Sequence, residues 1–157
     1  MGPTSLRVAA SAVLVVAASL ALLAGCGESK EDKFKADFKP LNDQLLKLGQ
    51  DVGRGVTTAT GKTDAQLAAE FGGFAGRTGS LRGRIDDLDP PDKLRADHRR
   101  LVGALGLLQR DLSGIQSAAT HHNPRAAGLA TRALIRDSLR ERTSRAALAR
   151  ATGAKVR

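Results

Sequence analysis

The sequence predicts an all-α protein: an up-down-up-down bundle of four helices, preceded by an N-terminal leader and a short tether. Three observations predict this fold. Apolar residues recur in alternate steps of three and four, a spacing that keeps them on one side of an α-helix. Proline and capping residues separate one such series from the next. Residues that favour strands are few, since Trp and Tyr are absent and the chain has only four Phe.

The first helix is expected after residues 26–33, because residues 27–33 are polar, have no apolar face and are typical of a tether. Pro40 leaves two alternatives: the helix begins near Asp37, or it begins earlier and kinks at Pro40. The apolar series of this helix consists of Phe34, Phe38, Leu41, Leu45, Leu48 and Val52.

The second helix follows a capping-box pattern formed by Thr63 and Gln66. Its apolar series consists of Leu67, Phe71, Phe74, Thr78, Leu81, Ile85 and Leu88. A second stripe consists of Gly72, Gly76, Gly79 and Gly83. Either these glycines allow another backbone to approach closely, such as the third helix at Gly103 and Gly106, or they reflect a GC-rich genome and have no packing role.

The third and fourth helices each begin at proline. Asp89-Pro90-Pro91 ends the second helix and starts the third, because the residue before a proline avoids the helical region while proline suits a first turn. The third series consists of Leu94, His98, Leu101, Leu105, Leu108, Leu112 and Ile115. Asn123 is the expected N-cap of a fourth helix that runs from Pro124 to about Thr152.

The fourth helix has the weakest apolar pattern. Ala127, Ala130, Leu134 and Leu148 continue a heptad, but polar residues interrupt it. The interruptions are Ser138, Glu141 and Arg145. We therefore expect the helix to dock through its first half and to fray towards Arg157. Because short turns leave no room for crossovers, the helices should pack antiparallel in a bundle over 34–153, followed by a basic tail at 154–157.

The leader, residues 1–25, has one charge at Arg7 and an uncharged apolar run from Val8 to Leu22. It closes on Leu23-Ala24-Gly25-Cys26, and Cys26 is the only cysteine. This arrangement resembles the lipobox of bacterial lipoproteins. The resemblance implies cleavage between Gly25 and Cys26, diacylation of the Cys26 thiol, and attachment by palmitate-type acyl chains to the extracytoplasmic face of the cell membrane.

Two other interpretations compete for the leader. A plain signal peptide has a similar apolar core, and a transmembrane helix from Val8 to Ala24 would be near the lower length limit for spanning. Both leave the position of a lone cysteine unexplained in an oxidising compartment. Lipidation explains it.

A weaker resemblance lies at the second proline turn. The stretch Leu88-Asp-Pro-Pro-Asp-x-Leu94-x-x-x-His98 is similar to a recurring element of small helical lipoproteins of actinobacteria. Those families have no established activity, so the resemblance implies the fold and the location only.

Residues for catalysis or metal binding are sparse. The nucleophile, zinc and phosphate-loop motifs are absent. Asp86, Asp87 and Asp89 lack the further ligands that a metal or acid/base site needs, and Asp89 and Asp92 are better explained as N-terminal charges favoured by the dipole of the third helix. His98 is interpreted as a polar residue that closes the core, whereas His121 and His122 end the third helix. We expect no catalytic residue, no cofactor and no metal site; only the two adjacent histidines merit a zinc test.

Positive charge is concentrated in the fourth helix and tail. The chain carries a net charge of +9, and residues 123–157 hold nine basic and two acidic side chains. A solvated face, an anionic surface and nucleic acid compete as explanations; the third is least favoured because no aromatic residue there can stack on bases. The candidates for contact with anionic lipid, a wall polymer or an acidic envelope protein are Arg125, Arg132, Arg136, Arg140 and Arg150.

Two functional hypotheses follow. The first is a non-enzymatic adaptor or scaffold lipoprotein that acts through its basic C-terminal helix. The alternative is a receptor lipoprotein for a small ligand or a metal, with its site in the bundle core. A receptor needs a cavity with a few convergent polar groups, and His98 and Thr78 are the only polar residues on the three apolar series.

Overall fold

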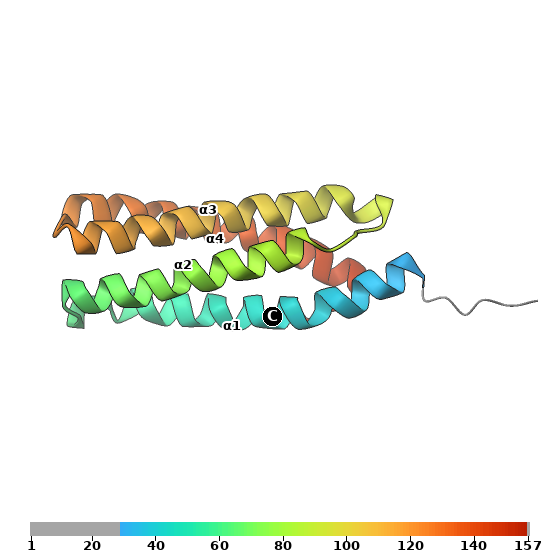
Figure 1. Ribbon diagram of the computed structural model, residues 1–157, viewed down its shortest axis with the longest axis horizontal. Coiled ribbons are helices and arrows are strands. Elements are labelled where there is room, and N and C mark those ends of the chain that lie inside the picture. The colour runs from blue at the N-terminus through green and yellow to red at the C-terminus, as the bar shows by residue number, and fades with distance from the viewer. Residues whose placement is uncertain (1–28, 157) are drawn as a thin grey trace, which may run out of the picture.

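The computed structural model describes residues 29–156, and the fold class is the predicted one. Successive helices run antiparallel along a single bundle (Figure 1). The helices are α1 (Lys30–Thr57), α2 (Asp64–Asp86), α3 (Arg95–Thr120) and α4 (Pro124–Thr152). Short 3-10 turns η1 (Ala59–Gly61) and η2 (Asp92–Leu94) lie in the first two connections.

Two helix starts match the sequence. The Thr63 hydroxyl accepts from the Gln66 backbone N–H, and the Gln66 side chain accepts in return from the Thr63 N–H, which completes the predicted capping box. Asn123 accepts from the N–H of Ala126 ahead of a proline in the first turn. Both pairings satisfy amide donors that a helix end leaves without an internal partner.

The start of α1 corrects the predicted tether. The helix begins at Lys30, because Ser29 accepts from the Asp32 N–H as its N-cap, and it runs through Pro40. The carboxylate of Glu31 lies 2.8 Å from Lys35 and 2.5 Å from Lys93, which follows Pro91. These two ammonium groups lower the pKa of Glu31 to about 2. The first turn of α1 is thereby tied to the turn that precedes α3.

The core consists of the three predicted series. Phe38, Ile85 and Leu101 are completely buried, and Leu148 joins them from α4. In the described residues, the members of the core cluster lie between Phe34 and Ala154, so the segment 29–157 carries this cluster. None of the helices in the described part is long and apolar enough to cross a bilayer.

The glycine stripe of α2 faces side chains rather than backbone. A Cβ on Gly72 would lie 2.8 Å from the amide of Gln116, and one on Gly79 would lie 2.7 Å from Gln109. Gly76 and Gly83 have open space around them. The α2–α3 pair is the most closely packed in the bundle, but the predicted backbone approach at Gly103 is wrong: the space at Gly72 and Gly79 is filled by glutamines.

The second half of α4 corrects a second prediction. Leu148, Ala149 and Thr152 are buried, so this half docks and the first half is the more exposed. Gly153 ends the helix in the left-handed conformation at φ 66°, and the Ala154 N–H donates to Ala149. The tail then folds back on α1, where Asn42 donates to the carbonyl of residue 155.

A buried ion pair is the physical reason. The Nε atom of Arg145 lies 3.2 Å from Oε1 of Glu141, and the same guanidinium donates to Asn42 and to the carbonyl of Val156. Two residues that interrupt the heptad therefore compensate each other's charge inside the bundle. Such compensation is what a buried charge requires.

Candidate functional site

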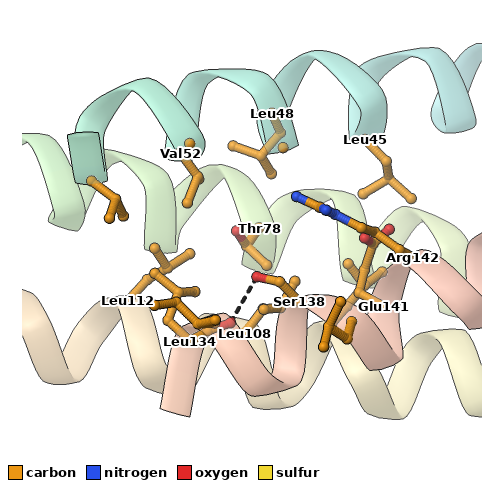
Figure 2. A pocket seen from close by; sticks show the side chains of 16 residues that line it. Leu45, Leu48, Val52, Thr78, Leu108, Leu112, Leu134, Ser138, Glu141 and Arg142 are labelled. Carbon is orange, nitrogen blue, oxygen red and sulfur yellow. Dashed lines mark hydrogen bonds between the residues drawn. The ribbon is translucent and has the colours of Figure 1, made fainter. Parts of the chain in front are cut away.

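A groove runs between α1 and α4 and reaches the core of the bundle. It encloses about 250 Å³. Figure 2 shows Leu45, Leu48 and Val52 extending into it from α1, with side chains of α3 and α4 opposite. The aliphatic side chains that line it are Leu45, Leu48, Val52, Val56, Leu105, Leu108, Leu112, Leu134, Ile135 and Leu139. Most of these belong to the predicted apolar series, so the groove is an opening in the core itself.

Two glycines widen the groove on the α1 side. Gly49 and Gly53 both line it, and a Cβ on either would meet no atom within 4 Å. Gly55 is different, because a Cβ there would lie 2.7 Å from the ring of Phe74. Close packing therefore accounts for Gly55, whereas the space beside Gly49 and Gly53 is open groove.

Most polar groups of the groove are already satisfied. The Thr78 hydroxyl donates to the carbonyl of Phe74 at 2.8 Å, and the Ser138 hydroxyl donates to that of Leu134 at 2.7 Å (Figure 2). Hydroxyls bound to their own helix present little polarity to a ligand. Glu141 and Arg142 are left as the polar groups of the wall.

Glu141 and Arg142 have opposite environments. Burial raises the pKa of Glu141 against the opposing charges of Arg145 and Arg142. Its Oε1 atom is near Arg145 but outside hydrogen-bond geometry, so it has no hydrogen-bond partner in the described residues. Arg142 is exposed, makes no ion pair within 29–156, and extends from α4 across the groove (Figure 2). The groove is thus an aliphatic trough with the exposed cation of Arg142 at its mouth and the largely buried carboxyl of Glu141 in its wall.

The predicted basic stripe lies on the outer face of α4. All of its members in the candidate set are exposed. Arg136 and Arg140 have a structural role that the sequence analysis missed: they lie 3.0 and 3.2 Å from the carboxylate of Asp137, whose side chain is 2% exposed. Hydrogen bonds from Arg136, opposed by burial, lower the pKa of Asp137. Arg125, Arg132 and Arg150 make no ion pair within the described part of the chain.

Three large apolar side chains share this outer face. Leu129, Ile135 and Leu139 are 58%, 57% and 60% exposed. At 100° per residue Leu129 falls within the arc of the arginines, and Leu139 and Ile135 lie about 20° and about 60° beyond its edge on the groove side. In the sequence they are apolar residues outside the heptad positions, so the heptad pattern alone does not identify them. Ile135 and Leu139 also form the lip of the groove.

The histidines have structural partners. His98 is buried and donates from Nε2 to the carbonyl of Ile85 at 2.6 Å, with its ring edge on Phe34, as the interpretation of a core-closing residue predicted. His121 bonds to the carbonyl of Ser117, and His122 lies 2.6 Å from Asp64 at the start of α2. In the described residues no three His, Cys, Asp or Glu side chains gather around a common point.

Other predicted residues lie outside the described range. These are the leader, the cleavage site at Gly25 and Cys26, the lipidated thiol and the last arginine of the tail. Comparison with protein-family models, with curated proteins and with solved structures gave no match to this chain.

Proposed function

We propose that the chain is a lipoprotein of the cell envelope, held by Cys26 to the extracytoplasmic face of the membrane, and that it is a binding module rather than an enzyme. Its outer α4 face docks on an anionic bilayer. One observation carries the docking: exposed Leu129 and Leu139 lie among the arginines of a single helix face. Large apolar side chains that are grouped on an exposed face and rimmed by polar residues are typical of a contact site for a membrane or a protein.

The combination of side chains favours a bilayer over other anionic surfaces. Each Arg near an anionic membrane contributes about 1 kcal/mol, within a Debye length of the surface. Leucines gain further free energy when they enter the apolar boundary below the headgroups. A wall polymer or a nucleic acid offers the charge without that apolar layer.

The arrangement of the helices suits this orientation. In Figure 1, α1 begins at the end of the bundle where α4 ends. Only residues 27 and 28 separate Cys26 from the cap of α1 at Ser29. A lipid on Cys26 would therefore hold that end close to the bilayer, and α4 would lie along the surface over about 43 Å at 1.5 Å per residue.

The test uses the unlipidated segment 29–157 and vesicles with and without anionic lipid. We expect binding that requires anionic lipid and weakens with salt. The decisive variant is Arg125→Glu/Arg132→Glu/Arg150→Glu, because it leaves the two arginines on Asp137 in place. It should lose binding. The matched control Lys39→Glu/Lys47→Glu/Arg99→Glu has the same net charge and changes exposed residues on α1 and α3.

Two outcomes separate the interpretations. If the α4 variant loses vesicle binding and the control variant retains it, docking through α4 is supported. Equal loss of vesicle binding in both variants would mean that net charge alone causes the binding. No vesicle binding by the wild type at low salt would contradict docking. Leu129→Ser should weaken binding without a change in charge.

A second function is favoured by the groove. An opening of the core between α1 and α4, with a few polar groups in its wall, has the features of a small-ligand site. A receptor function is compatible with docking, because Ile135 and Leu139 belong both to the outer face of α4 and to the lip of the groove.

A further inference from the structure

We propose that the groove between α1 and α4 binds a single-chain anionic amphiphile: an alkyl chain lies along the aliphatic trough, and its negatively charged head pairs with Arg142. This inference rests on the receptor function proposed above and names its class of ligand. It does not depend on the docking of α4.

The shape of the groove selects a linear chain. On α1 its lining runs from Leu45 to Val56, which corresponds to about 16 Å at 1.5 Å per residue. That length is close to the length of an extended dodecyl chain. The volume of about 250 Å³ suits one chain rather than the two chains of a phospholipid.

The lining selects an aliphatic ligand. Its walls are the side chains of leucine, valine and isoleucine, and the hydroxyls of Thr78 and Ser138 are bound to their own helices. A polar or heterocyclic ligand would leave its own donors and acceptors unpaired against such walls, which costs free energy. A methylene chain has no such groups, and each methylene it buries strengthens binding about fourfold.

Arg142 selects the sign of the head group. It is exposed at the mouth, extends across the groove and makes no ion pair among residues 29–156, although the neighbouring Glu141 carboxyl feels its charge. Glu141 also lines the groove, but its carboxylate is largely buried and lies 3.2 Å from Nε of Arg145, which compensates its charge. An anionic head is thus placed at a free guanidinium, which forms strong charge-assisted hydrogen bonds with carboxylate or phosphate.

The residues at the lip of the groove indicate how an alkyl chain would enter it. Ile135 and Leu139 are more than half exposed and line the opening, so a chain that leaves an apolar phase meets apolar side chains before it reaches the core. The exposed lip is also why the groove is accessible in the folded bundle without the movement of a helix.

The experiment is a calorimetric titration of segment 29–157 with dodecanoate below its micelle concentration. We expect one site per chain. Octanoate should bind at least tenfold more weakly, since it buries four fewer methylenes. Dodecyltrimethylammonium has the same chain and the opposite charge, and it should also bind more weakly. Arg142→Gln should weaken dodecanoate about fivefold and remove the preference for the anionic head.

Groove-filling variants test the location. Gly49→Leu and Gly53→Leu each place a side chain in open groove, and each should abolish binding while raising the midpoint of thermal unfolding. Gly73→Leu is the matched control, because Gly73 is exposed on α2 and also has open space at its Cβ. It should bind dodecanoate as the wild type does. If one groove variant fails to unfold cooperatively, the other supplies the result.

The outcomes are distinct. No binding of dodecanoate by the folded wild type, or full binding by both folded groove variants, would overturn the ligand site. Equal affinity for the cationic and anionic dodecyl probes would overturn the role of Arg142. A protein that binds dodecanoate but not anionic vesicles would overturn only the docking of α4, and the reverse result would overturn only the groove ligand.

Discussion

Helix α4 meets its two neighbours in different ways. Against α3 it packs closely, and a Cβ on Gly114 would lie 3.2 Å from that of Ala130. Against α1 it makes few contacts, and the space between them is the groove lined by Leu48, Gly49 and Leu139. Small residues on both sides let α3 and α4 approach, whereas long aliphatic side chains hold α1 away and the glycines beside them do not fill the gap. Residue size therefore decides which edge of the bundle is closed.

The largest effect should come from the closed core. Leu101 is completely buried, and Leu101→Ala should lower the free energy of unfolding by about 2–5 kcal/mol through the lost transfer energy and the cavity left behind. Leu129→Ala, on the open outer face, should change it by less than about 0.5 kcal/mol. Urea unfolding of both variants measures the difference. Similar losses would mean that the outer leucine is packed.

A second effect concerns the ion cluster on the α3-facing side of α4. Arg136→Gln/Arg140→Gln leaves the buried Asp137 carboxylate without its two cations and should lower the thermal midpoint at pH 7 by several degrees. Arg125→Gln/Arg132→Gln removes the same charge from the same helix and should cost less than about 0.5 kcal/mol. Equal thermal midpoints for the two double variants would show that Asp137 is not held by these arginines.

Replacing glycines on α1 by alanine should change the stability in opposite directions at two kinds of position. Gly49→Ala and Gly53→Ala should each stabilise the protein by up to about 1 kcal/mol, since alanine is the better helix former and the space is open. Gly55→Ala should destabilise it, because the new methyl would lie 2.7 Å from the Phe74 ring. Thermal unfolding measures all three, and a destabilised Gly49→Ala would mean that this part of the groove is closed.

How much the sequence predicted can be judged from these same residues. Two kinds of feature were predictable, because each depends on neighbours within one or two helical turns. They are the apolar series that contain Phe38 and Leu101, and the helix caps at Thr63 and Asn123. The docking of the second half of α4 was not. Burial of Arg145 depends on Asn42, which is 103 residues away in the chain and which no local pattern connects to it.

The candidate site was predictable only in part. The outer position of the arginines follows from helical periodicity alone, and the exposed leucines among them were visible in the same way. The groove was not predictable, because its width depends on the distance between α1 and α4, and that distance results from the side chains of all four helices. Gly49 and Gly53 are its only local trace in the sequence.

The smallest effect is a pH dependence at the α3–α4 edge. Burial, and then the neighbouring Asp137 carboxylate, raise the pKa of Asp111 above its ordinary value of 3.8. Ionised Asp111 therefore costs stability above its folded pKa, and this cost disappears as the pH falls to 3.8. Asp111→Asn should raise the unfolding midpoint at pH 7 by a few degrees, and the gain should shrink towards pH 4. A gain that is independent of pH would contradict this assignment.

The most direct test of the open edge is a methyl NMR titration of segment 29–157 with dodecanoate. If the groove between α1 and α4 holds an alkyl chain, the methyl resonances of Leu45, Leu48 and Val52 should shift in a saturable manner and show contacts to the chain. Those of Leu81 and Leu101, which do not line the groove, should change little. Shifts spread evenly over the core, or none at Leu48 and Val52 at saturation, would contradict the account.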